Sequence, residues 1–368
     1  MELQKFLQQH NDDWEEILGK EPYCLKWHRW GDGFISFKYR QECSDFSIPL
    51  VREARGCVFK EGGVWSCICR GFDKFFNYGE ELASDVEWES SRVMEKVDGS
   101  LIKVFYYNGW YAVSNSGFPL FEISTGNPKY KTFTEVFYLA LEKMGYSSIK
   151  SFVEGERLSK VRTYMFELVS PYTRATIPYP ETKLYYLGER ARVVHTEFFL
   201  PEKRNLVEIP KTYKMRSFED VVRSADELPW DDEGYVVVDK DFNRIKVKSP
   251  KWVLAHYMRN NNVVTKKRLM EVILAGEVEE FMTYADDYRL ELEELLRKKS
   301  SLQKEAELLR SLLHSHFSFT SQKELASVVS KIKNPYIRLF CYGEKSWEEM
   351  TKLWPASKWV SVLEQYNP

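Results

Sequence analysis

Short apolar runs rich in β-branched and aromatic residues recur through the first two thirds of the chain, and turn-forming residues separate them. Clear examples cover residues 33–37, 101–107 and 234–238, and runs of this kind are typical of β-strands. Asn108-Gly109 follows the second run directly, and apolar residues resume at Trp110. Because Asn-Gly is a preferred sequence for a tight hairpin turn, this segment predicts two paired antiparallel strands.

The pattern changes near residue 250. From residue 251 to residue 334 the chain contains no Pro and a single Gly, Gly276. Apolar residues in this stretch recur three, four or seven positions apart, which is the spacing of one helix face. They are Leu292, Leu295, Leu302, Ala306, Leu309 and Leu313. We therefore expect an α+β fold in two domains: a domain with antiparallel sheets over residues 1–255 and an all-helical domain over residues 256–368.

The composition is that of a soluble globular protein. Of the 368 residues, 43% are hydrophobic and 29% are charged, so the chain can bury a substantial core. Lys and Arg number 53 against 55 Asp and Glu, so any basic surface must be local. The apolar runs are far shorter than the roughly 20 residues that span a bilayer, and the first residues lack a signal-peptide core. These features predict a cytoplasmic protein with no membrane partner and with its six cysteines reduced.

The string Lys96-Val97-Asp98-Gly99 is the most informative short motif. It places a lysine two residues before an Asp-Gly turn, and a predicted strand leads away from the turn. Such an arrangement can hold an amine at the mouth of a pocket. A nucleophilic amine must be neutral to attack, so partial burial or neighbouring cations are required around it. On its own, however, the string is more often a surface hairpin.

Three later strings carry charges in unusual surroundings. Glu167 lies inside an apolar run, so its carboxylate needs a hydrogen-bond donor or a metal-linked partner. Glu233-Gly234 opens the predicted strand that follows. Lys246 and Lys248 alternate with apolar residues, so both ammonium groups project from one face of a strand. Because two adjacent ammonium groups repel each other, an anionic partner such as a polyphosphate would explain the pair.

In this order, the four strings resemble the motifs of the covalent nucleotidyltransferases, which include ATP-dependent ligases and GTP-dependent capping enzymes. The closer resemblance is to the bacteriophage T4 RNA ligase 1 family, and it runs essentially from end to end. Arg55-Gly56 is similar to that family's Arg-Gly element, Lys74-Phe75-Phe76-Asn77 to its Lys-Phe-Phe-Asn element, and Phe37-Lys38-Tyr39 to its N-terminal aromatic element. Asn115-Ser116-Gly117 departs from the family pattern, which has Lys before this Gly.

The resemblance implies an ATP-grasp-like nucleotidyltransferase domain and an ATP-dependent RNA ligase. Such an enzyme joins RNA 3′-hydroxyl and 5′-phosphate ends through a lysyl-AMP intermediate and an AMP-capped RNA 5′ end. It implies ATP and Mg²⁺ as cofactors, with Mn²⁺ as a substitute for Mg²⁺. The implied catalytic residues are Lys96, Asp98 and Glu233. The implied nucleotide-binding residues are Tyr39, Arg55, Lys74, Lys96, Glu167, Lys246 and Lys248, with Glu167 at the ribose. The implied metal ligands are Glu233 and Glu279.

The same resemblance implies RNA as the partner, with broken tRNA as the repair substrate, beside an end-healing polynucleotide kinase-phosphatase. It also implies a monomer in the cytoplasm, which is that of the infected host cell if the source is a virus. Each residue also has a simpler interpretation: Arg55 and Lys74 as surface residues beside turns, Tyr39 as a core aromatic, and Glu279 on a solvated helix face.

Three other functions fit the same motifs. A capping-type guanylyltransferase and a DNA ligase use the same catalytic core, but both usually carry a β-rich domain where this chain turns helical. A non-catalytic, nucleotide-sensing RNA-binding protein is the third, and the intact Lys96, Glu233 and Lys246 argue against it.

Overall fold

The computed structural model describes residues 1–31, 33–173, 176–198, 204–257, 265–284, 288–316, 322–352 and 354–366. The chain divides into two compact units, residues 1–256 and residues 257–368. Among the described residues, none of the helices combines the length and the apolar character that a bilayer crossing requires. All six cysteines carry free thiols, as the sequence predicts.

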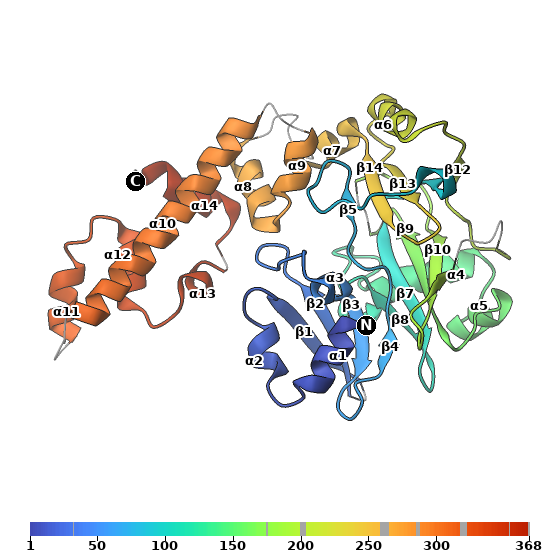
Figure 1. Cartoon of the computed structure of the whole chain (residues 1–368), viewed down its shortest axis with the longest axis horizontal. Helices are drawn as coiled ribbons and strands as arrows, with labels where there is room; N and C mark the ends of the chain where they lie inside the picture. Colours follow the sequence, from blue (N-terminus) through green and yellow to red (C-terminus); the bar gives the residue numbers. More distant parts are fainter. Residues whose placement is uncertain are drawn as a thin grey trace. The chain divides into compact units, whose positions relative to one another are not determined.

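The first sheet of the first unit is antiparallel throughout, in the order β1-β2-β3-β4. Its strands are β1 (Leu25–Trp30), β2 (Phe34–Tyr39), β3 (Arg55–Lys60) and β4 (Cys67–Cys69). Three helices belong to this region: α1 (Glu2–Gln9), α2 (Trp14–Leu18) and α3 (Pro49–Glu53). Leu3 and Leu7 lie four residues apart on α1 and, with Trp14 of α2, pack against Phe37 and other buried residues of the sheet (Figure 1). The helices therefore cover one face of this sheet.

The second sheet has the order β11-β10-β9-β7-β8 and is also antiparallel. Its strands are β7 (Ser100–Tyr106), β8 (Trp110–Ser114), β9 (Arg162–Val169), β10 (Lys183–Ala191) and β11 (Glu197–Phe198). One face packs on α4 (Phe133–Lys143) and α5 (Ile149–Gly155). From the other face, Phe105 and Val113 pack against buried residues of the first sheet. The hairpin predicted around Asn108-Gly109 is the β7–β8 pair, and that prediction is confirmed.

The third sheet has the order β12-β6-β13-β14-β5. Its strands are β5 (Phe76–Asn77), β6 (Arg92–Glu95), β12 (Thr212–Tyr213), β13 (Gly234–Val238) and β14 (Arg244–Lys248). One face packs on α6 (Phe218–Glu227), and α7 (Pro250–Tyr257) follows β14. The β5–β14 pair is parallel, whereas the other ladders of this sheet are antiparallel. The mixed α and β class with antiparallel sheets is confirmed, with this one parallel pair as an addition.

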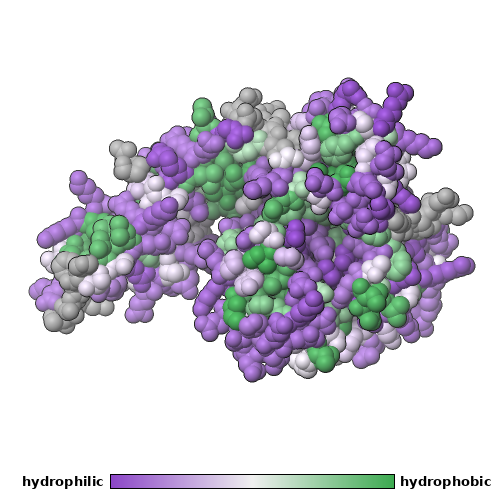
Figure 2. Space-filling view, in the orientation of Figure 1, coloured by the Kyte–Doolittle hydropathy of each residue, from purple (hydrophilic) through white to green (hydrophobic). Residues whose placement is uncertain are grey.

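The described part of the second unit consists of helices. They are α8 (Lys266–Ala275), α9 (Val278–Tyr284), α10 (Arg289–His316), α11 (Gln322–Val329), α12 (Pro335–Tyr342), α13 (Trp347–Thr351) and α14 (Ala356–Gln365). Most of the apolar stripe expected from the sequence lies on α10 and is buried, for example Leu292 and Leu302. Figure 2 shows apolar side chains on the surface over α12, where Leu339 and Tyr342 are exposed.

Candidate active site

A cavity of about 490 Å³ lies among the three sheets of the first unit, which is within the usual volume range of small-ligand sites. The third sheet turns its face opposite α6 toward this cavity, and the second sheet contributes β7 and β9. The charged residues along the cavity wall are Arg55, Glu95, Lys96, Glu167, Arg244, Lys246 and Lys248. Five of the residues that the sequence singled out for nucleotide binding therefore line one cavity.

Lys96 follows β6 directly, and its backbone N–H donates to the carbonyl of Gly234 at 2.8 Å. Its Nζ lies 2.7 Å from Oε2 of Glu233, whose side chain is only 4% exposed. The other carboxylate oxygen of Glu233 lies 3.6 Å from Nζ of Lys248. Glu233 therefore orients the ammonium of Lys96 and also offsets part of the positive charge of Lys248.

Two motif glycines allow the backbones around Lys96 to approach each other. Gly234 has φ +131°, and a Cβ built there would lie 2.2 Å from the carbonyl oxygen of Val247. A Cβ at Gly99 would lie 2.6 Å from the carbonyl oxygen of Leu168. Any larger residue at either position would push apart the strands that carry Lys96, Glu233 and Glu167.

Asp98 points into the protein and anchors a loop. One of its oxygens accepts hydrogen bonds from the backbone N–H groups of Thr176 and Ile177, both at 2.7 Å. Burial raises the pKa of Asp98, and the nearby charge of Glu233 adds to the increase. The residues described along the cavity wall do not include Asp98. The structure therefore gives Asp98 a positioning contact next to Lys96.

Glu167 extends from β9 into the cavity and is partly buried. Burial raises the pKa of Glu167 to about 8, and the positive charge of Lys96 only partly opposes the increase. The sequence required a donor for this carboxylate, yet no hydrogen-bond donor to it is found in the described part of the chain. A ligand hydroxyl in the cavity could supply that donor.

Arg244 is a cavity residue that the sequence reasoning missed. It lies two residues before Lys246 on β14, and both residues line the cavity together with Lys248. The same alternation that placed the two lysines on one face extends to position 244, so the signal was present. The guanidinium of Arg244 also forms an ion pair with Glu197 at 2.5 Å.

Tyr39 and Lys74 lie beside each other, but the residues described along this cavity do not include them. Nζ of Lys74 lies 4.4 Å from the ring centre of Phe46 and 5.2 Å from that of Tyr39, and it donates to the side-chain oxygen of Gln41 at 3.1 Å.

Phe75 is the member of this element that reaches the cavity. The centre of its ring lies 5.4 Å from the guanidinium carbon of Arg55 and 5.4 Å from Nζ of Lys246.

Glu279 lies exposed on α9 of the second unit. Within the described ranges, no three or more His, Cys, Asp or Glu side chains gather into a group that could hold a metal ion.

A family model described as RNA ligase matches residues 53–252, which is more than half of the chain and includes all the cavity residues named above. The chain belongs to this family, of the T4 RNA ligase 1 type, and the resemblance seen in the motifs is confirmed.

Three relatives are similar to this chain. The RNA ligase of Rhodothermus phage RM378 is 24% identical in an alignment of 403 residues, which covers 90% of this chain and 87% of that protein. RNA ligase 1 of bacteriophage TS2126 is 32% identical over 212 residues, or 53% of this chain and 49% of that protein. A protein of Autographa californica nuclear polyhedrosis virus, whose name pairs a polynucleotide kinase with an RNA ligase, is 28% identical over 251 residues. That match covers 65% of this chain but only 35% of the viral protein.

Proposed function

We propose that this protein is an ATP-dependent, AMP-forming RNA ligase. The observation that carries the proposal is the position of Nζ of Lys96, 2.7 Å from Glu233, at the wall of a cavity that also receives four cations. Arg55, Arg244, Lys246 and Lys248 supply those positive charges, which suit a triphosphate.

In the first step, Nζ of Lys96 attacks the α-phosphorus of ATP. A P–N bond forms, the bond to the bridging oxygen breaks, and pyrophosphate leaves. Glu233 is the nearest carboxylate to the amine and is placed to take its proton. The cavity cations offset the negative charge that develops on the leaving group, and this favours the transition state over the bound substrate.

Two further steps complete the reaction. The 5′-phosphate of RNA attacks the lysyl-AMP phosphorus, which breaks the P–N bond and caps the RNA end with AMP. The 3′-hydroxyl of the other RNA end then attacks the RNA phosphorus and releases AMP, leaving a phosphodiester. The covalent intermediate divides one difficult exchange into steps with lower barriers.

Glu167 and Glu233 are the residues that would hold the ribose and the metal. Glu167 has no hydrogen-bond donor within the described part of the chain, so a ribose hydroxyl would satisfy it as a donor. Mg²⁺, or Mn²⁺ in its place, commonly uses one or two carboxylates together with substrate phosphates, and Glu233, beside Lys96, would be one such carboxylate. The metal would supply further positive charge at the phosphates. Glu279 stays a proposed ligand from the resemblance alone.

RNA repair is the proposed task, with broken tRNA as the substrate and the helical second unit selecting it. The viral relative whose name pairs a kinase with a ligase supports an end-healing kinase-phosphatase as a partner. We propose that the enzyme acts as a monomer in the cytoplasm.

The test is intact mass and radiolabel transfer after incubation with Mg²⁺ and ATP labelled at the α-phosphate. Wild type should gain one acid-labile, base-stable AMP, and Lys96→Ala should gain none. Lys20→Ala replaces a lysine that is 70% exposed and should label like wild type. Labelling by GTP would indicate a capping enzyme, and joining of nicked DNA would indicate a DNA ligase. Bound ATP without an adduct would overturn the proposal and indicate a nucleotide-sensing binder.

A further inference from the structure

Lys103 is a fully buried lysine that the chemistry above does not use. It lies in the middle of β7, where side chains alternate between the two faces of the sheet. Ile102 and Val104 pack in the core beneath α4 and α5. Phe105 packs toward the first sheet, and Lys103 shares that face. An ammonium in this position needs hydrogen-bond acceptors, because burying it without them is costly.

Three backbone carbonyl groups surround the ammonium of Lys103. Its Nζ donates to the carbonyl oxygens of Arg55 and Asn115, both at 3.2 Å, and also to the carbonyl oxygen of Gly56. A lysine ammonium has three N–H donors, so donors and acceptors are matched in number. Burial lowers the pKa of Lys103, and the three carbonyl dipoles favour its charged form.

The three acceptors belong to two chain segments that meet at close range. Arg55 and Gly56 begin β3, whereas Asn115 lies in the turn after β8. A Cβ at Gly56 would lie 1.9 Å from the carbonyl oxygen of Asn115, and a Cβ at Gly71 would lie 2.8 Å from Cδ of Lys103. Glycines therefore leave room both for the contact of the two segments and for the side chain that joins them.

Both segments form part of the cavity wall. Arg55, Asn115 and Ser116 line the cavity that contains Lys96, whereas the described cavity wall does not include Lys103. We propose that Lys103 is a positioning residue of the active site. Its ammonium fixes the start of β3 to the turn at 115–117 and so holds the guanidinium of Arg55 toward the polyphosphate of the nucleotide. This inference rests on the proposed function, since it concerns the same cavity.

Two substitutions separate positioning by hydrogen bonds from simple filling of space. Lys103→Met keeps much of the apolar length and removes all three donors, whereas Lys103→Gln keeps two donors on a shorter side chain. If the ammonium holds the two segments by hydrogen bonds, the methionine variant should raise the KM for ATP in lysyl-AMP formation at least tenfold. The glutamine variant should raise it less. If Lys103 only fills space, the shorter glutamine should raise the KM for ATP more than methionine does.

Val104→Ala is the matched control, because it alters the same strand on the face that packs against α4 and α5. It should lower the thermal midpoint and leave the KM for ATP unchanged. If Lys103→Met does not fold, the comparison of Lys103→Gln with Val104→Ala decides the question. A KM for the glutamine variant within twofold of wild type would then overturn the inference, and a severalfold increase would support it.

A double-mutant cycle tests whether Lys103 acts through Arg55. In an Arg55→Lys background, adding Lys103→Gln should raise the KM for ATP by a smaller factor than it does in wild type. The reason is that the guanidinium, which Lys103 is proposed to position, has already been replaced. Equal factors in both backgrounds would contradict action through Arg55. If wild type forms no adduct, the proposed function fails. If wild type labels normally and both Lys103 variants keep its KM, the positioning role alone fails.

Discussion

At the scale of single residues, Gly234 sets how closely β13 and β14 approach beside Lys96. Its φ of +131° excludes a side chain, and so does the space around it, since a Cβ at this position would lie 2.2 Å from the carbonyl oxygen of Val247. We expect Gly234→Ala to lower the free energy of unfolding by about 2–4 kcal/mol, the sum of backbone strain and steric overlap. Denaturant unfolding of the purified variant measures this loss.

Gly126 offers the matched control for this prediction. Its φ is also positive, +72°, but nothing lies within 4 Å of a Cβ at that position. Gly126→Ala should therefore cost only about 1 kcal/mol, from backbone strain alone. Equal losses in the two variants would contradict a steric role for the close strand contact at Gly234.

Glu167 predicts a pH dependence of stability. Burial raises its pKa from 4.5 to about 8, so between these values the folded protein keeps a proton that the unfolded chain has lost. Stability from this group is therefore full below about pH 4.5 and falls as the pH rises, by up to about 1.4 kcal/mol per pH unit. Glu167→Gln, which does not titrate, should stabilise the protein more at pH 8 than at pH 5.

Thermal unfolding of wild type and Glu167→Gln at pH 5, 6, 7 and 8 measures this effect. Both proteins share every other titrating group, so the difference between their curves isolates Glu167. Parallel curves across the four pH values would show that the carboxyl titrates near its ordinary value and would contradict the prediction.

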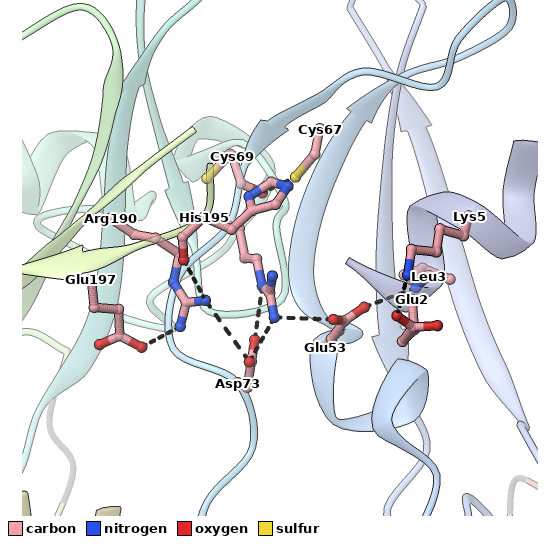
Figure 3. A network of polar contacts seen from close by, with 11 residues as sticks. Glu2, Leu3, Lys5, Glu53, Cys67, Cys69, Asp73, Arg190, His195 and Glu197 are labelled. Carbon is pink, nitrogen blue, oxygen red and sulfur yellow. Dashed lines mark hydrogen bonds and ion pairs between the residues drawn. The ribbon is translucent and has the colours of Figure 1, made fainter. Parts of the chain in front are cut away.

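At the scale of elements, a chain of ion pairs links all three sheets, and Figure 3 shows its part from Glu53 to Glu197. Arg70, just after β4, lies 3.1 Å from Glu53 and 2.7 Å from Asp73. Asp73 lies 3.9 Å from Arg190 of β10, and Arg190 pairs with Glu197 of β11. Glu197 in turn pairs with the cavity residue Arg244, so the network joins the cavity wall to the first sheet.

Removal of the buried guanidinium of Arg70 takes away the ion pair of Glu53 and leaves Asp73 with only the longer contact to Arg190. Arg70→Met should therefore lower the free energy of unfolding by about 3–5 kcal/mol. Arg223→Met breaks an exposed pair with Asp220, in which the arginine side chain is 71% exposed, and should cost less than about 1 kcal/mol. Urea unfolding of both variants measures the contrast, and similar small losses would show that water screens the buried network.

Local patterns predicted elements, and they predicted contacts only within one strand or between two strands joined by a short turn. The Asn108-Gly109 turn gave the β7–β8 hairpin, and alternation gave the shared face of Lys246 and Lys248. Lys103 could be recognised only as a strand residue, because its acceptors on residues 55, 56 and 115 come from the start of β3 and from the turn after β8. Lys74 stays a predicted nucleotide-binding residue, but the neighbouring Phe75 is the one found along the cavity wall, since which face of an extended segment meets the cavity depends on packing with other sheets.

At the scale of the whole molecule, the cavity residues belong to one unit. The residues described along the cavity wall fall between Arg55 and Lys248, and the first unit covers residues 1–256. The second unit has a core of its own, which includes Leu292, Leu302 and Trp359. We therefore predict that cutting the chain between the units separates nucleotide chemistry from the proposed selection of RNA.

A chain that ends at His256 should keep adenylylation of Lys96 and lose most of its RNA joining. The expected result is an adduct within about twofold of the full chain, because the nucleotide would contact only the first unit. Joining of a nicked tRNA anticodon loop should fall at least tenfold, because the helical unit would no longer hold the RNA. Labelling with α-labelled ATP and gel-based joining on the same samples measure the two steps. A truncated chain that folds and joins tRNA ends like the full chain would remove the RNA-selecting role from the second unit. Loss of the adduct in a folded truncated chain would instead place part of the nucleotide site in that unit.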